Sequence, residues 1–327
     1  AIVVGRLDES GERFVAMGLP RDEAILDLLT AGEPVGQRVY VRSFGYGNRV
    51  AVDKRSMDAQ APVTVAAVRA AYEHLLVRRE GHLLEVTINR ADSRNALHPP
   101  AHEELEEVFD AFFDDPDLWV AILTGAGTQA FCAGNDLIYT ATGKPMYVPR
   151  SGFAGLTSRR HMSKPVIAAV NGFAMGGGLE TALACHLMVV DEAVQLALSE
   201  VRVGLIAGAG GLIRLPRQIP RKIATEMILT GRRMGAAEAL DRGLANRVVP
   251  MGTALEGARA LANEILQGSP TSVRLSLQVM AETEGVADST DAVVRRTDAI
   301  DELITSEDMA EGLAAFAQKR APRWRGR

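Results

Sequence analysis

Apolar segments of strand length alternate with helical segments between about residues 76 and 220, and this alternation constrains the fold more than any other feature. The stretch HLLVRREGHLLEVTINR alternates polar and apolar residues about one glycine, which predicts a hairpin. PPAHEELEEVFDAFF has helical spacing, and further strands are expected at WVAILTG, AFCAG, KPVIAAVNG, HLMVV and VQLALS. Strands that alternate with helices predict an α/β fold.

The two flanking parts of the chain have a different character. After about residue 220 the pattern predicts helices only, separated by Gly, Pro and Ser. These helices are expected over residues 221–230, 235–242, 252–267, 270–283, 287–304 and 306–319. Before residue 76, RDEAILDLLTAG predicts a helix and QRVYVRSFGYGNRVAVD predicts a pair of strands. We therefore expect an N-terminal extension over 1–75, then a mixed α/β body, then a helical tail.

Composition limits the classes of partner and the compartment. With 47% hydrophobic residues in a chain of 327, there are enough apolar side chains for a substantial core. The 36 basic residues do not exceed the 41 acidic ones and form no basic block, so we expect no nucleic-acid partner. We also expect no membrane partner and a cytoplasmic protein, because no apolar run spans a bilayer and the N-terminus lacks a signal-peptide pattern.

The cysteines and histidines indicate neither a disulfide framework nor a metal site. Cys132 and Cys185 are the only cysteines, and they are not part of a CxxC motif. His98 and His102 are four residues apart, but HPPAH reads as the start of a helix, which favours capping or surface positions. We therefore expect no bound metal.

NGFAMGGGLETALAC, residues 171–185, places three glycines directly before an apolar helical segment that carries one carboxylate, Glu180. One interpretation is a tight turn with an exposed acid in the first helical turn. In the other, apolar neighbours bury Glu180 and raise its pKa towards neutrality, while free amides at the helix N-terminus stabilise a developing oxyanion. The residues alone leave both interpretations open.

A second carboxylate, Glu200, ends the apolar strand in LALSEVRVGLIAGAGG and precedes another glycine-rich turn. By itself it reads as a strand-end acid in solvent. Two acids beside two glycine turns favour a paired acid/base site. Neither GxGxxG, a P-loop nor GxSxG occurs, so the sequence supports neither a phosphate cradle of these kinds nor acyl-enzyme chemistry.

Five ordered motifs resemble the crotonase superfamily, which includes enoyl-CoA hydratases and isomerases. They are TINRADSRNAL, AFCAGNDL, KPVIAAVNGFAMGGGLE, LALSEVRVGLIAGAGGLIRLPRQI and SEDMAEGLAAFAQKRAPRWRGR. The resemblance covers about residues 76–327 and leaves 1–75 outside. It implies a crotonase-like spiral of ββα units over 76–250 that holds the acyl-CoA site. It also implies a C-terminal helical region over 251–327 that takes part in oligomerisation and in the CoA site.

The resemblance further implies roles for individual residues. In the family two backbone amides hold the thioester oxygen of an acyl-CoA, and the matching positions are Asn135 and Gly177. In its hydratases two glutamates flank the double bond, and they match Glu180 and Glu200. The first would orient and deprotonate water, and the second would exchange a proton with the α-carbon.

The family also holds the adenine of CoA near the RNAL turn, which implies a backbone contact at Ala96 with Arg94 nearby. CoA is then part of the substrate, and no tightly bound cofactor is implied. The family further implies a homo-oligomer, either a trimer or a hexamer, and a place in fatty acid metabolism.

These residues favour a lyase that carries out reversible syn hydration of a 2-enoyl-CoA. The chain departs from the family pattern at Ser199, where proline usually precedes the acid, and AGNDL also occurs in isomerase-like members. The alternatives are therefore an enoyl-CoA delta-isomerase that uses Glu200 and a non-catalytic crotonase-like binding protein. The presence of both acids argues against the binding protein. Loop 138–155 has no readable motif, so the sequence does not predict the acyl chain.

Overall fold

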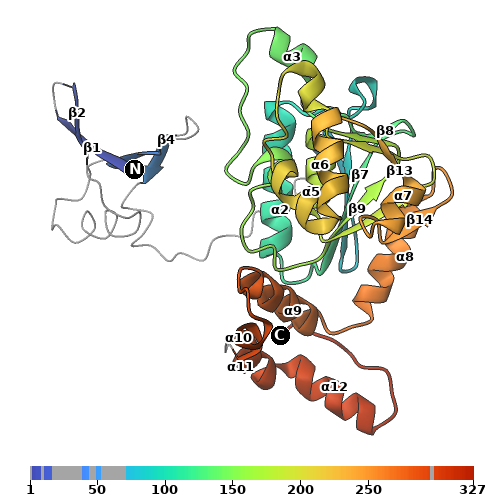
Figure 1. The fold of residues 1–327 in the computed structure, drawn as a ribbon. Helices are drawn as coiled ribbons and strands as arrows, with labels where there is room; N and C mark the ends of the chain where they lie inside the picture. The colour runs from blue at the N-terminus through green and yellow to red at the C-terminus, as the bar shows by residue number, and fades with distance from the viewer. Residues whose placement is uncertain (1, 9–10, 17–38, 44–48, 53–70, 295–297) are drawn as a thin grey trace. The chain divides into compact units, whose positions relative to one another are not determined.

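The chain forms two compact units, residues 1–64 and residues 65–327. The computed structural model describes residues 2–8, 11–16, 39–43, 49–52, 71–294 and 298–327. The larger unit contains two sheets with their covering helices, and a group of helices at the end of the chain (Figure 1). The two sheets of this unit determine where its functional residues lie.

A four-stranded antiparallel sheet forms the described part of the N-terminal unit, with strand order β2-β1-β3-β4. Its strands are β1 (Ile2–Asp8), β2 (Gly11–Ala16), β3 (Val39–Ser43) and β4 (Arg49–Val52). The predicted pair of strands over residues 37–53 is therefore confirmed as β3 and β4. The helix predicted over residues 21–32 lies outside the described residues.

A six-stranded sheet forms the centre of the larger unit, with strand order β14-β11-β9-β7-β6-β5. Its strands are β5 (Leu75–Glu80), β6 (Leu83–Ile88), β7 (Val120–Gly125), β9 (Val166–Val170), β11 (Leu187–Asp191) and β14 (Arg247–Val249). β5 and β6 form the predicted hairpin, in which Gly81 turns the chain with a φ of 56°. All other neighbours in this sheet are parallel.

The side chains of the six-stranded sheet alternate between two apolar clusters. On β7, Ile122 belongs to the smaller cluster and Leu123 to the larger one on the opposite face. A period of two residues is what a strand with both faces covered requires. Helix α8 (Ala254–Leu266) covers the face of the smaller cluster. It presents three alanines at a spacing of four, whose small side chains allow a close approach to the strands: Ala254, Ala258 and Ala262.

A second, four-stranded sheet has the order β13-β12-β10-β8. Its strands are β8 (Ala130–Cys132), β10 (Phe173–Met175), β12 (Gln195–Ala197) and β13 (Met234–Gly235). The pairs β7 and β8, β9 and β10, and β11 and β12 each place the first strand in the large sheet and the second in the small one. Because β8, β10 and β12 are parallel neighbours, the segments that follow them leave the sheet at the same edge.

Helices cover the two sheets. The predicted helix after the hairpin is α2 (Pro99–Asp114), which begins with two prolines and buries Leu105, Phe109 and Phe112 on one face. The other helices of this part are α3 (Leu137–Ala141), α4 (Gly177–Ala184), α5 (Gly211–Gln218), α6 (Arg221–Thr230) and α7 (Ala236–Asp241).

The prediction that only helices follow residue 220 is wrong. β13 pairs antiparallel with β12, and β14 pairs parallel with β11. These strands are two and three residues long, so no alternating pattern can appear in the sequence. Their extended conformation comes from hydrogen bonds to the edge of an existing sheet. The three-residue β10, an inner strand of the small sheet, was not predicted either.

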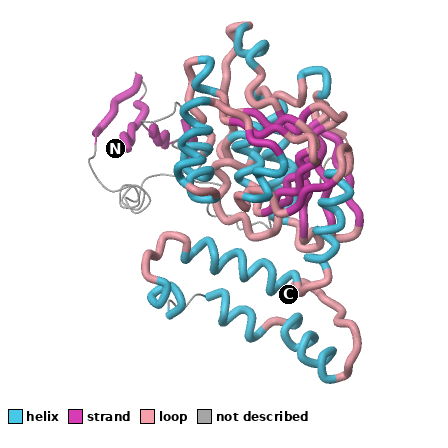
Figure 2. Tube along the Cα trace, turned by 45° about the vertical axis from the view of Figure 1, so that its right-hand side comes forward, coloured by secondary structure: helices cyan, strands magenta, loops and turns pink. Residues whose placement is uncertain are grey.

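The end of the chain contains only helices and loops among its described residues (Figure 2). The helices are α9 (Pro270–Thr283), α10 (Ser289–Val294), α11 (Asp298–Thr305) and α12 (Glu307–Ala317). The single helix predicted over 287–304 corresponds to α10 and α11, and residues 295–297 between them lie outside the described residues. No helix of the described ranges has the length and apolar character needed to cross a membrane.

The packing of β7 against β8 predicts the effect of a small substitution. A Cβ on Gly125 would lie 2.4 Å from the carbonyl oxygens of Ala130 and Phe131, so Gly125→Ala must push these strands apart. We expect the free energy of unfolding to fall by about 3 kcal/mol, measured from the denaturant midpoint. Gly235→Ala is the control, because nothing lies within 4 Å of its Cβ position, and its change should stay within about 0.5 kcal/mol. Equal midpoints for the two variants would contradict this packing.

Candidate active site

Three segments meet at one edge of the small sheet, because β8, β10 and β12 are parallel neighbours. They are the turn at residues 133–136, the glycines at 176–178 and the 3-10 turn Glu200–Val203. These segments and the first turn of α4 carry the predicted catalytic and oxyanion-hole residues: Asn135, Gly177, Glu180 and Glu200. The topology therefore brings together residues that lie far apart in the sequence.

Two of the three consecutive glycines allow close packing at this edge. Gly176 has a φ of 53° and a ψ of −122°, a region that residues with a side chain rarely adopt. A Cβ on Gly176 would also lie 3.0 Å from Oε1 of Glu200. A Cβ on Gly178 would lie 2.0 Å from the carbonyl oxygen of Cys132. Glycine thus lets the chain turn beside a carboxyl group and lets α4 pack against β8.

Gly177 is the first residue of α4, where backbone amides have no partner within the helix. Among the described residues its amide has no hydrogen-bond acceptor, whereas the amide of Gly176 donates to the carbonyl oxygen of Ala197 at 2.9 Å. The ring of Phe153 occupies the place of a Cβ on Gly177, with Cζ at 2.6 Å. A free amide at the positive end of a helix dipole is suited to bind a negatively charged oxygen.

The amide of Asn135 is a second free donor within the described part of the chain. The amide of Leu97 donates to the carbonyl oxygen of Gly134 at 2.8 Å, and the amide of Asp136 donates to that of Leu97 at 2.9 Å. Because neighbouring residues of an extended segment face opposite sides, the Asn135 amide points away from Leu97. A Cβ on Gly134 would lie 3.2 Å from the nitrogen of Gly177, so this turn is directly beside the start of α4.

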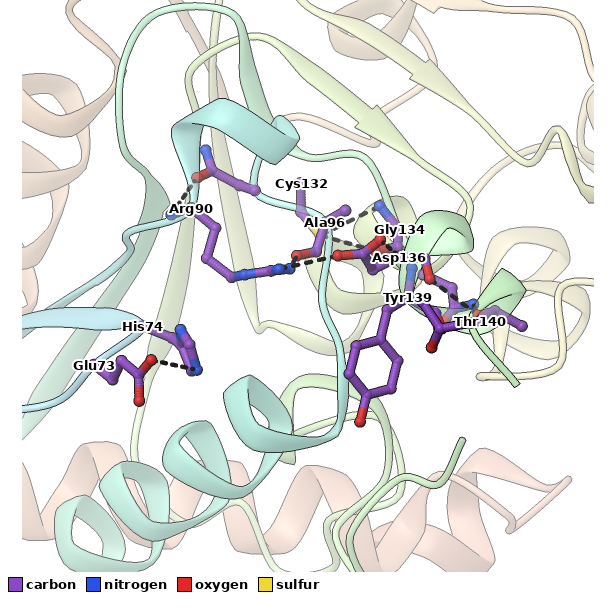
Figure 3. A network of polar contacts seen from close by, with 12 residues as sticks. Glu73, His74, Arg90, Ala96, Cys132, Gly134, Asp136, Tyr139 and Thr140 are labelled. Carbon is purple, nitrogen blue, oxygen red and sulfur yellow. Dashed lines mark hydrogen bonds and ion pairs between the residues drawn. The ribbon is translucent and has the colours of Figure 1, made fainter. Parts of the chain in front are cut away.

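An ion pair holds the turn that carries Asn135 (Figure 3). Oδ2 of Asp136 lies 2.9 Å from Nη2 of Arg90, and Arg90 also donates to the carbonyl oxygen of Ala96. The amide of Tyr139 donates to Oδ1 of Asp136 at 3.0 Å. Burial opposes ionisation, but this hydrogen bond and the Arg90 guanidinium hold the pKa of Asp136 below its ordinary value. The ion pair therefore ties the Asn135 turn to the segment around Ala96.

Glu180 lies in the first turn of α4 and is only 3% exposed. Its Oε1 accepts a hydrogen bond of 2.8 Å from the amide of Gly211. Burial raises the pKa of Glu180 to about 7, the Gly211 hydrogen bond opposes this shift, and the charge of Glu200 adds to it. The interpretation of GGGLE as a turn with an exposed acid is therefore wrong. A carboxyl group of this kind can take up and release protons near neutral pH.

Glu200 begins the 3-10 turn that follows β12. Its Oε2 is buried and has no hydrogen-bond partner among the described residues, and burial raises its pKa. Ser199 has a φ of −97°, which lies outside the narrow range of proline, so the backbone here differs from one that a proline would impose. The unpaired oxygen is available to a ligand.

Arg214 on α5 is a charged group that the sequence did not single out for this site. Its guanidinium donates to the carbonyl oxygens of Thr157 at 2.8 Å and Ala209 at 3.4 Å. Its positive charge has a small effect that lowers the pKa of Glu180. Arg214 therefore anchors the glycine-rich turn that leads into α5, and the first residue of α5, Gly211, donates the hydrogen bond to Glu180.

The two residues predicted to contact CoA lie between β6 and α2. Arg94 is exposed and lines a cavity of about 530 Å³ together with the loop 126–130. Ala96 is buried and does not line that cavity. Its amide donates to the carbonyl oxygen of Ser93 at 3.0 Å, and its carbonyl oxygen accepts from Arg90. Because a carbonyl oxygen can accept two hydrogen bonds, the carbonyl oxygen of Ala96 can accept one more. A CoA contact at Arg94 and Ala96 stays a prediction.

Sequence reasoning missed four residues that shape the site: Arg90, Asp136, Phe153 and Arg214. Arg90 and Asp136 lie within TINRADSRNAL and AFCAGNDL, so each was in a recognised motif without an assigned role. Arg214 lies within GGLIRLPR in the same way. Phe153 lies in the loop over 138–155, and no pattern in the sequence points to its contact with α4.

The arrangement combines two free amides with a buried acid, Glu180, and a half-buried acid, Glu200, and the pKa of each acid is raised. Such a set can bind an oxygen that gains negative charge and move protons beside it. No three His, Cys, Asp or Glu side chains of the described residues are placed to hold a metal ion. The fold and site define a protein suited to proton transfer next to a carbonyl group.

Comparison with known proteins is consistent with this class of site. A family model described as enoyl-CoA hydratase/isomerase matches residues 78–327. A carnitinyl-CoA dehydratase of Proteus mirabilis (strain HI4320) is 41% identical over 259 residues, which cover 78% of this chain and 98% of that protein. The crystal structure of an enoyl-CoA hydratase from Mycobacterium tuberculosis H37Rv has a TM-score of 0.74 and 38% identity, and covers 78% of this chain and 100% of its own. A carnitinyl-CoA hydratase from Mycobacterium avium has a TM-score of 0.62 and 41% identity, with coverage of 79% and 100%.

The chain belongs to the enoyl-CoA hydratase/isomerase family. The resemblance to the crotonase superfamily and the predicted crotonase-like α/β fold are thereby confirmed. The family match begins at residue 78, so the four-stranded N-terminal sheet lies outside it.

The raised pKa of Glu180 makes stability depend on pH. In the unfolded chain its pKa is about 4.5, whereas the folded protein keeps the proton up to about pH 7. Above about pH 4.5 ionisation therefore favours the unfolded state increasingly, until the folded pKa is passed. The side chain at position 180 of the Glu180→Gln variant stays neutral at all these pH values. The free energy of unfolding of this variant should therefore rise by up to about 3 kcal/mol relative to that of the wild type as pH rises through this interval.

Denaturant unfolding of both proteins at about pH 5 and about pH 8 measures this difference. The matched control is Glu192→Gln, because Glu192 is exposed. A stability difference between Glu180→Gln and the wild type that is the same at both pH values would contradict a buried acid with a raised pKa.

Proposed function

We propose that residues 76–327 catalyse the reversible syn hydration of a 2-enoyl-CoA, which makes this protein a lyase. One observation carries the proposal: the buried carboxyl group of Glu180 and the half-buried one of Glu200 lie near the N-terminus of α4 beside two free backbone amides. Membership of a family described as enoyl-CoA hydratase/isomerase supports an acyl-CoA as the substrate class.

The thioester oxygen of the substrate accepts hydrogen bonds from the amides of Asn135 and Gly177. As water adds to the β-carbon, negative charge develops on this oxygen and an enolate forms. Donors that are already in place bind the enolate more tightly than the substrate, and the positive end of the α4 dipole adds to this effect. Loss of one such donor typically costs about 10²- to 10³-fold in rate.

The two glutamates move the protons of the reaction. Glu180 takes a proton from water, whose oxygen bonds to the β-carbon, and Glu200 gives a proton to the α-carbon of the enolate. Both additions occur on the same face of the double bond. In dehydration Glu200 removes the α-proton, and Glu180 protonates the hydroxyl group as it leaves as water. Because the charge of one acid disfavours ionisation of the other, the pair is suited to hold one proton near neutral pH.

Two alternatives use the same fold. An enoyl-CoA delta-isomerase needs only Glu200, and it would leave the buried Glu180 without a chemical task. A crotonase-like protein that only binds acyl-CoA needs neither acid. Removing a carboxyl oxygen from water costs stability, so the presence of the buried Glu180 and of the buried, unpaired Oε2 of Glu200 favours hydration over these alternatives.

A 3-hydroxyacyl-CoA with a quaternary ammonium group is a second candidate substrate. The observation in its favour is that relatives at 41% identity are named carnitinyl-CoA dehydratase and carnitinyl-CoA hydratase. In carnitinyl-CoA the ammonium group is attached to the carbon next to the one that bears the hydroxyl group. Dehydration then uses the same steps, with a cation near Glu180 and Glu200 that favours their ionised forms.

The proposal extends to the CoA moiety and to assembly. We expect the adenine near Ala96 and Arg94, with CoA leaving as part of the product and no cofactor retained. We also expect a homo-oligomer, a trimer or a hexamer, formed through residues 251–327. Large apolar side chains of this region that are more than half exposed support such an interface: Val293, Val294, Ile304, Leu313 and Phe316.

The test is loss of the enoyl-thioester absorbance when the protein is mixed with a short neutral 2-enoyl-CoA. Glu200→Gln keeps the shape of the acid but cannot transfer the proton, so we expect turnover to fall about 10²- to 10⁴-fold. Glu180→Gln should lose hydration to a similar extent. Glu192→Gln, at an exposed position, is the control and should hydrate at the wild-type rate.

Each result separates the candidates. Wild-type hydration rates in both Glu180→Gln and Glu200→Gln would contradict the two-acid mechanism. A double-bond shift that survives in Glu180→Gln, without hydration by the wild type, would support the isomerase. The ratio of kcat/KM for the neutral substrate to that for its 4-trimethylammonium analogue decides between the two substrate classes.

A further inference from the structure

The turn Phe153–Gly155 packs across α2 and reaches the start of α4. A Cβ on Gly155 would lie 2.7 Å from the backbone nitrogen of Glu106, so the turn lies against the α2 backbone. The amide of Ser151 donates to Oε1 of Glu106 at 2.9 Å, and Nε of Arg159 donates to the carbonyl oxygen of Gly155 at 2.8 Å. Contacts on both sides therefore hold this turn on α2.

Phe153 projects from this turn onto the glycine that begins α4. Its ring atoms lie 2.6 to 2.9 Å from the place of a Cβ on Gly177, and the residue is 7% exposed. Gly177 is not among the glycines with a positive φ, so the ring is the reason that a side chain is excluded there. The ring thus forms the wall beside the free amide of Gly177.

His102 of α2 contacts this turn through a hydrogen bond and through its ring. It is fully buried, and its Nδ1 accepts a hydrogen bond of 3.1 Å from the amide of Ala154. Its ring meets the Phe153 ring edge-on, with 4.4 Å between centroids and an interplanar angle of 66°. Burial, with smaller effects of the charges of His98 and Arg90, lowers the pKa of His102 to about 3. The imidazole is therefore neutral near neutral pH, with its proton on Nε2.

The backbone of Ala154 has an unfavourable conformation within this turn. It has a φ of 55° and a ψ of 22°, the left-handed region that a residue with a side chain seldom adopts. Such a conformation persists only where the surroundings hold it. Here the conformation of Ala154 is held by the hydrogen bond to His102 and by the α2 backbone that packs against Gly155.

We propose that His102 is a positioning residue for the oxyanion hole: through Ala154 and the Phe153 ring it holds the wall that keeps the Gly177 amide in place and shielded from water. This inference rests on the proposed function, in which that amide binds the thioester oxygen. A donor in a dry, fixed site stabilises an enolate more than a mobile and hydrated one. His102 therefore acts on the transition state through Phe153, without contact with the substrate.

The test compares two variants of similar size at one buried position. His102→Leu removes the acceptor for the Ala154 amide, whereas His102→Asn places an amide oxygen close to the position of Nδ1. We expect His102→Leu to lower kcat for hydration about 10- to 100-fold with little change in KM. His102→Asn should keep most of the wild-type kcat. The control on the same helix is Glu104→Gln, because Glu104 accepts from the amides of Glu73 and His74 and not from this turn.

A second measurement applies even if His102→Leu folds poorly. Phe153→Leu leaves α2 intact and should also lower kcat while the affinity for the 3-hydroxyacyl-CoA product is retained. Because both residues act on one amide, the double variant should lose little more than either single variant. Effects that add in full, or a wild-type kcat in a folded His102→Leu protein, would overturn the inference. Absence of hydration by the wild type would instead overturn the proposed function, and this inference with it.

Discussion

Close packing of the start of α4 against its neighbours is the constraint on which the site depends. The parallel pairing of β8, β10 and β12 directs three turns to one edge, and only residues without a Cβ allow them to come together. The same packing leaves the amides of Gly177 and Asn135 without partners among the described residues. It also places Gly176 against the carboxyl group of Glu200. One steric requirement thus creates both the donors and the position of an acid.

The electrostatics of the site follow from this packing. Glu180 and Glu200 are drawn into an apolar region, where burial raises the pKa of each. The shift of Glu180 is partly opposed by the amide of Gly211 and by the charge of Arg214, and that of Glu200 by a hydrogen bond from its own backbone. An oxygen of Glu200 remains buried without a partner among the described residues. The burial of these carboxyl oxygens lowers the stability of the folded protein. Such a cost is common at sites that position ionisable groups for a reaction.

The sequence predicted the parts of the fold that have a regular pattern. The hairpin and α2 carry clear periodicity, and the resemblance to the crotonase superfamily implied the repeated units. The short edge strands β13 and β14 carry none, because their form comes from the sheet that they join. Glu180 and Glu200 were predicted from their place beside glycine turns. Phe153 was not, since a contact between a loop and a helix start leaves no local pattern. The capping or surface position expected for His102 is wrong, because its side chain is fully buried.

In the proposed mechanism, two backbone amides and two carboxyl groups act on one acyl-CoA. A crystal structure with a bound 3-hydroxyacyl-CoA tests it most directly. We expect the thioester oxygen about 2.7–3.1 Å from the nitrogens of both Asn135 and Gly177, with the β-hydroxyl group in contact with Glu180 and the α-carbon facing Glu200. A thioester bound away from the start of α4, or out of reach of either carboxyl group, would contradict it.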